Sequence, residues 1–115
     1  MGKKAKKKAP QRVHLMTLRV GPDEYEVYEH PEPGSLPQGP GGNLLGYCSH
    51  PDAEIVVKSS QRARRKRASL FHEALHAVDW EYGIGLSEKQ VRKLETGLLN
   101  VIDDNPDLLG GNHGR

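Results

Sequence analysis

The sequence contains a single cysteine, Cys48, among its 115 residues. One cysteine excludes an internal disulfide framework and a cysteine-rich zinc finger. The sequence also has no apolar run near the length of a membrane span, and no signal peptide with an apolar central region is visible. With 35% hydrophobic residues, the chain fits one compact domain with a modest core. We therefore expect a cytoplasmic protein without a membrane partner.

Acidic residues are absent from the first twelve positions, which carry six positive charges: Lys3, Lys4, Lys6, Lys7, Lys8 and Arg12. Since the whole chain has a net charge of +2, the remaining residues sum to −4. A second basic cluster contains Arg62, Arg64, Arg65, Lys66 and Arg67. No helix-turn-helix, finger or RNA-recognition pattern accompanies either cluster. The clusters predict weak, non-specific contact with nucleic-acid phosphates, or simply a solvated charged surface.

The apolar pattern predicts strands in the first half and helices in the second. Residues rich in β-branched and aromatic side chains are separated by turn residues, which predicts four strands in two hairpins: 13–20 with 24–30, and 44–49 with 54–58. Between the hairpins, residues 31–42 are too rich in proline and glycine for a regular element. We expect an α+β domain over residues 13–107, with a small twisted β-sheet followed by two packed helices. Residues 1–12 are predicted to be a disordered basic tail and 108–115 a flexible one.

Two helices are predicted after the sheet. The first runs from a cap at Ser59 or Ser60 to about Tyr82, where glycines end it, and its expected core stripe is Phe71, Leu75, Val78 and Tyr82. The second opens with a capping box, Ser87 followed three residues later by Gln90. Asn105-Pro106 ends it. The short turn between the helices predicts that they pack side by side.

Within the first predicted helix, His72, Glu73 and His76 form an HExxH pattern. A spacing of four residues places both imidazoles on one helix face, about 40° apart, so both can reach one ion. Zinc accepts imidazole nitrogen, and a glutamate beside the first histidine can take a proton from zinc-bound water. The alternative is two ordinary histidines beside a solvated glutamate. The position of the pattern in a helix after a sheet favours Zn²⁺, with Glu73 as the catalytic base.

The third ligand is predicted on the second helix, at Glu95. Its neighbours on that helix are apolar, and a buried carboxylate there would be costly without a cation. In the alternative, Glu95 lies at the edge of the apolar face and reaches water. Asp79 shares the helix face of His72 and His76, so we expect it to hydrogen-bond a ligand histidine or else to pair with a surface cation.

The motif HExxH, followed after 18 residues by a glutamate on the next helix, resembles the gluzincin zinc peptidases. The stretch from "GYCSHPDAEIVV" to "SLFHEALHAVDWEYGIGLSEKQVRKLETGLLNVIDDNP", about residues 44–107, is similar to small HExxH proteins of bacteriophages and mobile elements. Those proteins are related to minigluzincins and to ImmA/IrrE-type metallopeptidases. The metzincin pattern does not fit, because glycine is absent at position 79 and histidine at position 82.

The resemblance implies a zincin-like fold and peptide-bond hydrolysis, with zinc bound by His72, His76 and Glu95 and with Glu73 as general base. It also implies that the strand "AEIVV" is the sheet edge that pairs with an extended peptide substrate. The substrate would be a protein in a phage or mobile-element setting, such as a DNA-bound repressor. The alternative is a catalytically weak or inactive zinc domain that binds protein or nucleic acid.

One feature of the gluzincin pattern is missing, because no tyrosine follows Glu95 to stabilise the oxyanion, and the only later histidine is His113. Tyr82, Tyr47 and His50 are the candidate substitutes. Cys48 is interpreted as a small buried side chain outside the site.

Overall fold

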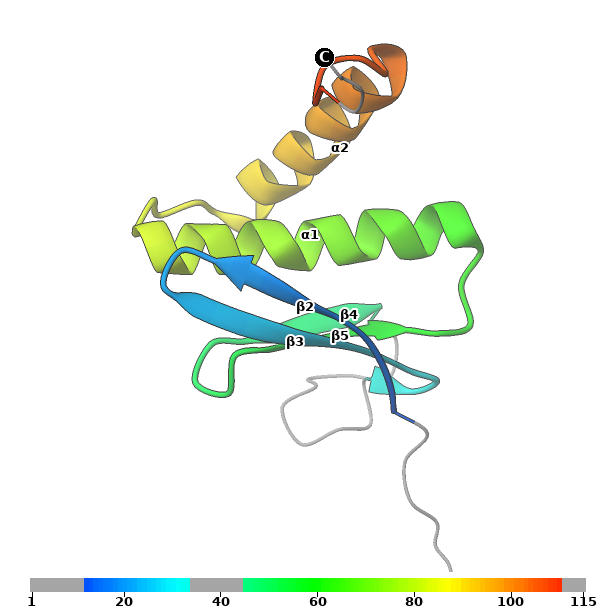
Figure 1. Ribbon diagram of the computed structural model, residues 1–115, viewed down its shortest axis with the longest axis vertical. Helices are drawn as coiled ribbons and strands as arrows, with labels where there is room; N and C mark the ends of the chain where they lie inside the picture. Colours follow the sequence, from blue (N-terminus) through cyan, green and yellow to red (C-terminus); the bar gives the residue numbers. More distant parts are fainter. Residues whose placement is uncertain (1–11, 34–44, 111–115) are drawn as a thin grey trace, which may run out of the picture.

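The computed structural model describes residues 12–33 and 45–110 of the chain. Residues 1–11 of the predicted tail 1–12, residues 111–115 of the predicted tail 108–115, and most of the predicted proline- and glycine-rich loop 31–42 lie outside these residues. Arg12, expected in the disordered tail, instead pairs with Glu54. In chain order the described elements are β2 (Val13–Val20), β3 (Asp23–His30), β4 (Gly46–Ser49), β5 (Glu54–Lys58), α1 (Ala63–Tyr82) and α2 (Glu88–Asp104). The predicted α+β order, a sheet followed by two packed helices, is confirmed (Figure 1).

The four described strands form one mixed sheet in the order β2-β3-β5-β4. Both predicted hairpins are present, since β2 pairs antiparallel with β3 and β4 pairs antiparallel with β5. The two hairpins join through β3 and β5, which run parallel. This pairing corrects one expectation: the "AEIVV" strand, β5, is flanked on both sides and is not an edge. Of the described strands, the edge on that side of the sheet is β4.

The core lies between the sheet and α1. Alternate residues of β3 and β5 point to the same face, and these are fully buried: Tyr25, Val27, Ile55 and Val57. Ala77 of α1 joins this cluster, and Leu70 and Val78 pack against it. Burial of this face fixes the height and rotation of α1 above the sheet, and therefore the direction in which its polar side chains point.

Helix α1 begins later than predicted, and only part of its expected apolar stripe, Val78, packs against the core. Its N-cap is Arg62, without a side-chain cap, so the expected cap at Ser59 or Ser60 is wrong. The residues that α1 buries are Ser69, Glu73 and Ala77, whereas Tyr82, expected in the core stripe, is 64% exposed. The C-terminal end follows the prediction, because Gly83 adopts the left-handed conformation that glycine favours (φ 61°).

Helix α2 begins with the predicted capping box. The Ser87 side chain accepts a hydrogen bond from the Gln90 backbone, and the Gln90 side chain accepts one from the Ser87 backbone. The helix crosses α1 near its own start and its axis then diverges from α1 and the sheet (Figure 1), with Asp103 near its end bonded to Arg67 of α1. Among the described residues, no helix is long and apolar enough to cross a membrane.

Candidate metal centre

The HExxH residues of α1 line a cleft of about 780 Å³. The cleft is bounded by edge strand β4, the β4–β5 turn, α1 and the first turns of α2. His72 and His76 lie on adjacent turns, with ring centroids 4.9 Å apart. Their side chains are largely buried, at 15% and 27% exposure, so the helix presents both rings to the same enclosed space, as the four-residue spacing predicts.

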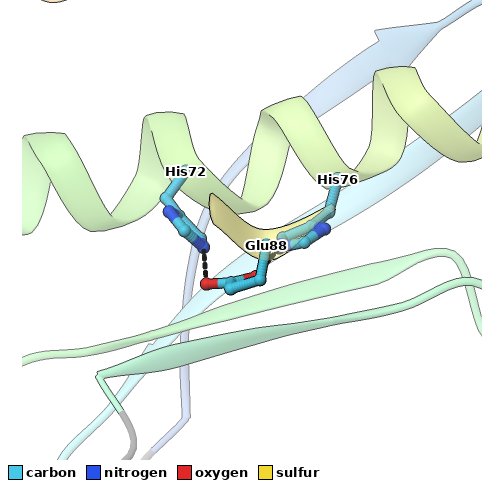
Figure 2. Close-up of side chains that lie close together, drawn as sticks. All are labelled: His72, His76 and Glu88. Carbon is cyan, nitrogen blue, oxygen red and sulfur yellow. Dashed lines mark hydrogen bonds and ion pairs between the residues drawn. The ribbon is translucent and has the colours of Figure 1, made fainter. Parts of the chain in front are cut away.

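Glu88, the first residue of α2, reaches between the two rings (Figure 2). Its Oε2 lies 2.9 Å from Nε2 of His72, and its Oε1 lies 2.9 Å from Nε2 of His76. Arg92 donates to the same carboxylate from one turn further along α2. Burial opposes ionisation of Glu88, but the hydrogen bond from Arg92 and the charges of His72 and His76 outweigh it and lower the pKa. Glu88 is therefore a carboxylate held against both Nε2 atoms.

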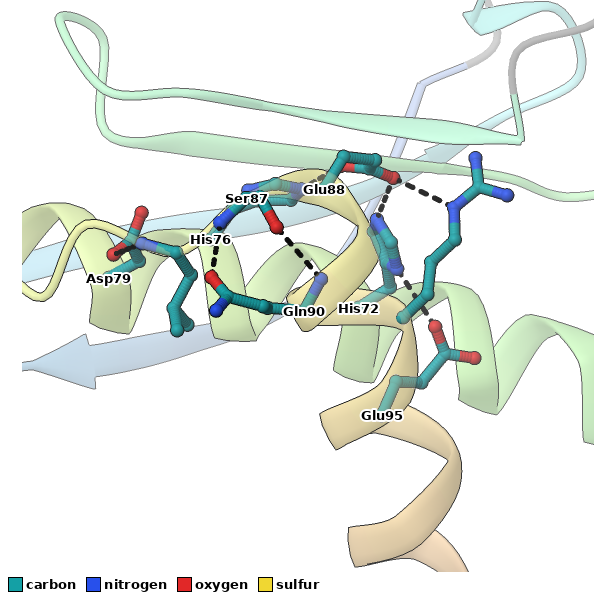
Figure 3. A network of polar contacts seen from close by, with 9 residues as sticks. His72, His76, Asp79, Ser87, Glu88, Gln90 and Glu95 are labelled. Atoms are coloured by element: carbon teal, nitrogen blue, oxygen red, sulfur yellow. Dashed lines mark hydrogen bonds and ion pairs between the residues drawn. The ribbon is translucent and has the colours of Figure 1, made fainter.

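Glu95 contacts the opposite nitrogen of the first histidine. Its Oε1 lies 2.8 Å from Nδ1 of His72 (Figure 3). A neutral imidazole has one N–H and one lone pair, so it can donate to only one of two carboxylates. If Nδ1–H donates to Glu95, then Nε2 presents a lone pair to Glu88, and that contact needs a proton or a cation between the two atoms. The arrangement around His72 is thus the one that a metal ion on Nε2 would satisfy.

The donor atoms fit a small divalent ion. One nitrogen from each of His72 and His76 and one oxygen from Glu88 lie within 4.8 Å of one another. Two ligands of a tetrahedral zinc, each 2.0–2.1 Å from the ion, are about 3.3 Å apart. The two nitrogen–oxygen separations of 2.9 Å are close to that value. His72, His76 and Glu88 could therefore hold a metal ion.

Glu73 points from α1 into the interior and is only 8% exposed. Burial raises its pKa to about 7, and the neighbouring carboxylates Glu88 and Glu95 add to the rise, whereas His72 opposes it. Glu73 also lines the cleft. A carboxyl group with a pKa near neutrality, next to a metal-binding group, has the properties of a general base or acid.

Asp79 holds the turn between the helices. Its Oδ1 accepts hydrogen bonds from the backbone N–H groups of Gly85 and Leu86, at 2.7 and 2.9 Å (Figure 3). The predicted hydrogen bond from Asp79 to a ligand histidine is not among its contacts within residues 12–33 and 45–110. Instead, Asp79 fixes the two residues that precede Ser87, and so sets where Glu88 begins α2.

Sequence analysis did not identify Glu88. The capping box was the available signal, because it fixes Ser87 as the N-cap and makes Glu88 the first helical residue. The crossing point of α1 and α2 decides which carboxylate of α2 meets the Nε2 atoms, and that is a tertiary property. Glu95 as a direct ligand stays a prediction, since in the structure it contacts Nδ1 of His72.

Of the three candidates for oxyanion stabilisation, two line the cleft. Tyr47 and His50 face it, whereas Tyr82 lies with its hydroxyl against Gly21 at the β2–β3 turn. His50 stacks on Trp80, with centroids 4.6 Å apart, and burial followed by the nearby His76 lowers its pKa. Cys48 also lines the cleft, but burial raises the pKa of its thiol to about 12, which disfavours the thiolate that binds metals.

The second basic cluster is only partly neutralised. Lys66 pairs with Glu29, and Arg67 makes two bonds to Asp103 of α2. Arg62, Arg64 and Arg65 have no ion pair within the described part of the chain. The lysines predicted to contact nucleic acid, Lys3, Lys4, Lys6, Lys7 and Lys8, lie outside the described residues.

Comparison of the chain with protein-family models, with curated proteins and with solved structures found no match. The case for its function therefore depends on the geometry of the cleft.

Proposed function

We propose that this protein is a zinc-dependent peptidase of the gluzincin type, in which His72, His76 and Glu88 hold the ion and Glu73 is the general base. In this proposal Glu95 takes a different role from the predicted one: it accepts the Nδ1 proton of His72 and so orients that ring. The observation that carries the proposal is the Glu88 carboxylate, 2.9 Å from both Nε2 atoms and beside buried Glu73.

Each residue of the cleft has its own role in the proposed peptide-bond hydrolysis. When bound, zinc supplies a Lewis acid that polarises the scissile carbonyl and makes water a better nucleophile. Glu73 accepts a proton from the attacking water and passes it to the leaving amine. Tyr47 and His50, which also line the cleft, are the candidate donors to the oxyanion. A pKa near 7 suits Glu73 to both accepting and releasing a proton.

The substrate is proposed to bind as an extended peptide along β4. This strand is the edge of the described sheet next to the cleft, and Gly46, Tyr47 and Cys48 line the cleft wall. An edge strand offers unpaired backbone N–H and C=O groups, which pair with an added strand. The peptide would then pass between β4 and the two histidines of α1.

Cleavage of a peptide library by wild type and by Glu73→Gln tests the enzymatic proposal. We expect the variant to retain its zinc but to cleave at least about 100-fold more slowly, because general-base catalysis contributes 10²–10⁴-fold. Glu24→Gln is the matched control, since Glu24 pairs with Arg19 and does not line the cleft. Equal cleavage by wild type and Glu73→Gln, with equal zinc content, would refute hydrolysis by this site.

A nucleic-acid-binding role for the same zinc domain is the second candidate. The exposed Arg62, Arg64 and Arg65 favour it, because cations without acidic partners at the start of a helix are disfavoured by the helix dipole. Phosphate groups would neutralise these charges. Such contact would bring the cleft close to proteins bound on DNA or RNA.

A further inference from the structure

One face of α2 is apolar and exposed. Leu94, Leu98 and Val101 are 39%, 40% and 45% exposed, although they follow one another at the three- and four-residue spacings of a helical stripe. The residues of α2 that are buried or half-buried, Val91, Glu95, Leu99 and Ile102, lie to one side of this stripe. Beyond its crossing with α1, the helix axis diverges from α1 (Figure 1), and Arg67 of α1 still reaches Asp103 near the C-terminal end of α2.

Charges of opposite sign border this stripe. Lys93 and Asp104 are eleven residues apart, which is about three helical turns, so both lie on the same flank of the apolar stripe. Neither residue has an ion pair within the described ranges. Gly97 lies on that flank between them, and a side chain built there would meet no atom within 4 Å. The flank is therefore open to an approaching helix.

We infer that the exposed face of α2 pairs with the same face of a second copy of this chain, in antiparallel orientation. Helices related by a two-fold axis and running in opposite directions bring the same flank of each helix together. Lys93 of one copy then meets Asp104 of the other, and the reverse pair forms at the opposite end. The midpoint of positions 93 and 104 lies next to Leu98, so the two Leu98 side chains meet near the axis.

The charge pattern selects this occupant and this orientation. In a parallel pair related by a two-fold axis, this flank of one helix would face the opposite flank of the other, so Lys93 and Asp104 would not meet. The antiparallel pair brings each Lys93 to an Asp104 of opposite charge and covers Leu94, Leu98 and Val101 from water. A single helix pair buries less than the roughly 800 Å² per partner of a standard interface. We therefore expect weak association, with a Kd in the micromolar range.

Analytical ultracentrifugation of the full chain between about 10 µM and 1 mM tests this inference. We expect a monomer–dimer equilibrium that Leu98→Glu abolishes over this range. Lys93→Glu and Asp104→Lys should each weaken the dimer about tenfold, because each places like charges together at two symmetric contacts. Asp23→Lys, an equally large charge change at the start of β3 in the sheet, should leave the equilibrium unchanged. Circular dichroism checks that each variant keeps its helices.

Mixing the two single variants gives the sharpest test. A Lys93→Glu chain and an Asp104→Lys chain have complementary charges only in the antiparallel arrangement, so the mixture should dimerise as wild type does. The double variant in one chain should do the same. A wild-type chain that stays monomeric at 1 mM would overturn the inference. The exposed face of α2 would then be a binding surface for a different protein. A dimer insensitive to Leu98→Glu, or a mixture that is not rescued, would overturn it equally.

Discussion

The ring of His72 makes the strongest argument for a metal. Glu95 lies at Nδ1 and Glu88 at Nε2, at 2.8 and 2.9 Å, and a neutral ring can donate to only one of them. A cation at Nε2 removes the conflict, and it also explains why His76 shares the same carboxylate. His72, Glu73 and His76 could be predicted because their grouping depends only on the helical repeat. The role of each α2 carboxylate could not, because it depends on how two helices cross.

The buried Glu73 carboxyl predicts a pH-dependent stability in the metal-free protein. Its pKa is about 7 in the folded chain, against an ordinary value of 4.5, with burial as the main cause. Because the folded state holds the proton more tightly, folding is favoured at low pH. This advantage is lost as the pH rises from about 4.5 to 7. By pH 8 the ionised group should cost about 3 kcal/mol.

Glu73→Gln removes the titrating group and leaves a neutral side chain of similar size. In EDTA-treated protein we expect the variant to exceed wild type in free energy of unfolding by about 3 kcal/mol at pH 8, and to match it near pH 4. Urea unfolding at a series of pH values measures the difference. A difference that does not change with pH would show that Glu73 is not a buried acid with a raised pKa.

At the scale of elements, the turn between α1 and α2 positions the site. Gly83 ends α1, Asp79 binds the backbone of Gly85 and Leu86, and Ser87 caps α2. The capping box and the glycine could be read from the sequence because each is a local signal. The sheet-facing side of α1 was predicted only in part: Val78 packs against the core as expected, but Tyr82 is exposed, and the residues that α1 buries are Ser69, Glu73 and Ala77.

Asp79→Ala should loosen this turn. Two backbone N–H groups would lose a charged acceptor, so we expect the free energy of unfolding to fall by about 2 kcal/mol. Zinc should bind several-fold more weakly, because Glu88 follows this turn by two residues. Asp79→Asn keeps an oxygen acceptor and should lose less of both. Thermal unfolding and zinc titration give the two readouts, and Asp79→Ala with wild-type values in both would contradict this role for Asp79.

At the scale of the whole molecule, the sheet brings the cleft together from distant parts of the chain. The two hairpins were predictable from alternation and turn residues. Their parallel junction between β3 and β5 was not, because it pairs residues nearly 30 positions apart and leaves no local pattern. That junction makes β4 the edge beside the cleft and moves the expected substrate strand from β5 to β4.

Arg62, Arg64 and Arg65 form an exposed basic surface at the start of α1. If it binds nucleic acid, replacing Arg62, Arg64 and Arg65 by glutamate should weaken binding to duplex DNA at least about tenfold and flatten its salt dependence. Replacing Lys66 and Arg67, which already have acidic partners, should have less effect. Gel-shift titrations at 50 and 200 mM salt measure both. Binding that ignores salt and all of these changes would rule out phosphate contacts through this surface.

The measurement that tests the central proposal most directly is zinc affinity, determined by competition with a chelator for wild type, Glu88→Ala and Glu95→Ala. We predict one zinc per chain in wild type and at least about 100-fold weaker binding in Glu88→Ala, which loses a ligand. Glu95→Ala should weaken binding only about tenfold, because that residue orients His72. Glu24→Ala should match wild type. Wild-type affinity in Glu88→Ala with loss of zinc in Glu95→Ala would contradict the proposed site and return the ligand role to Glu95.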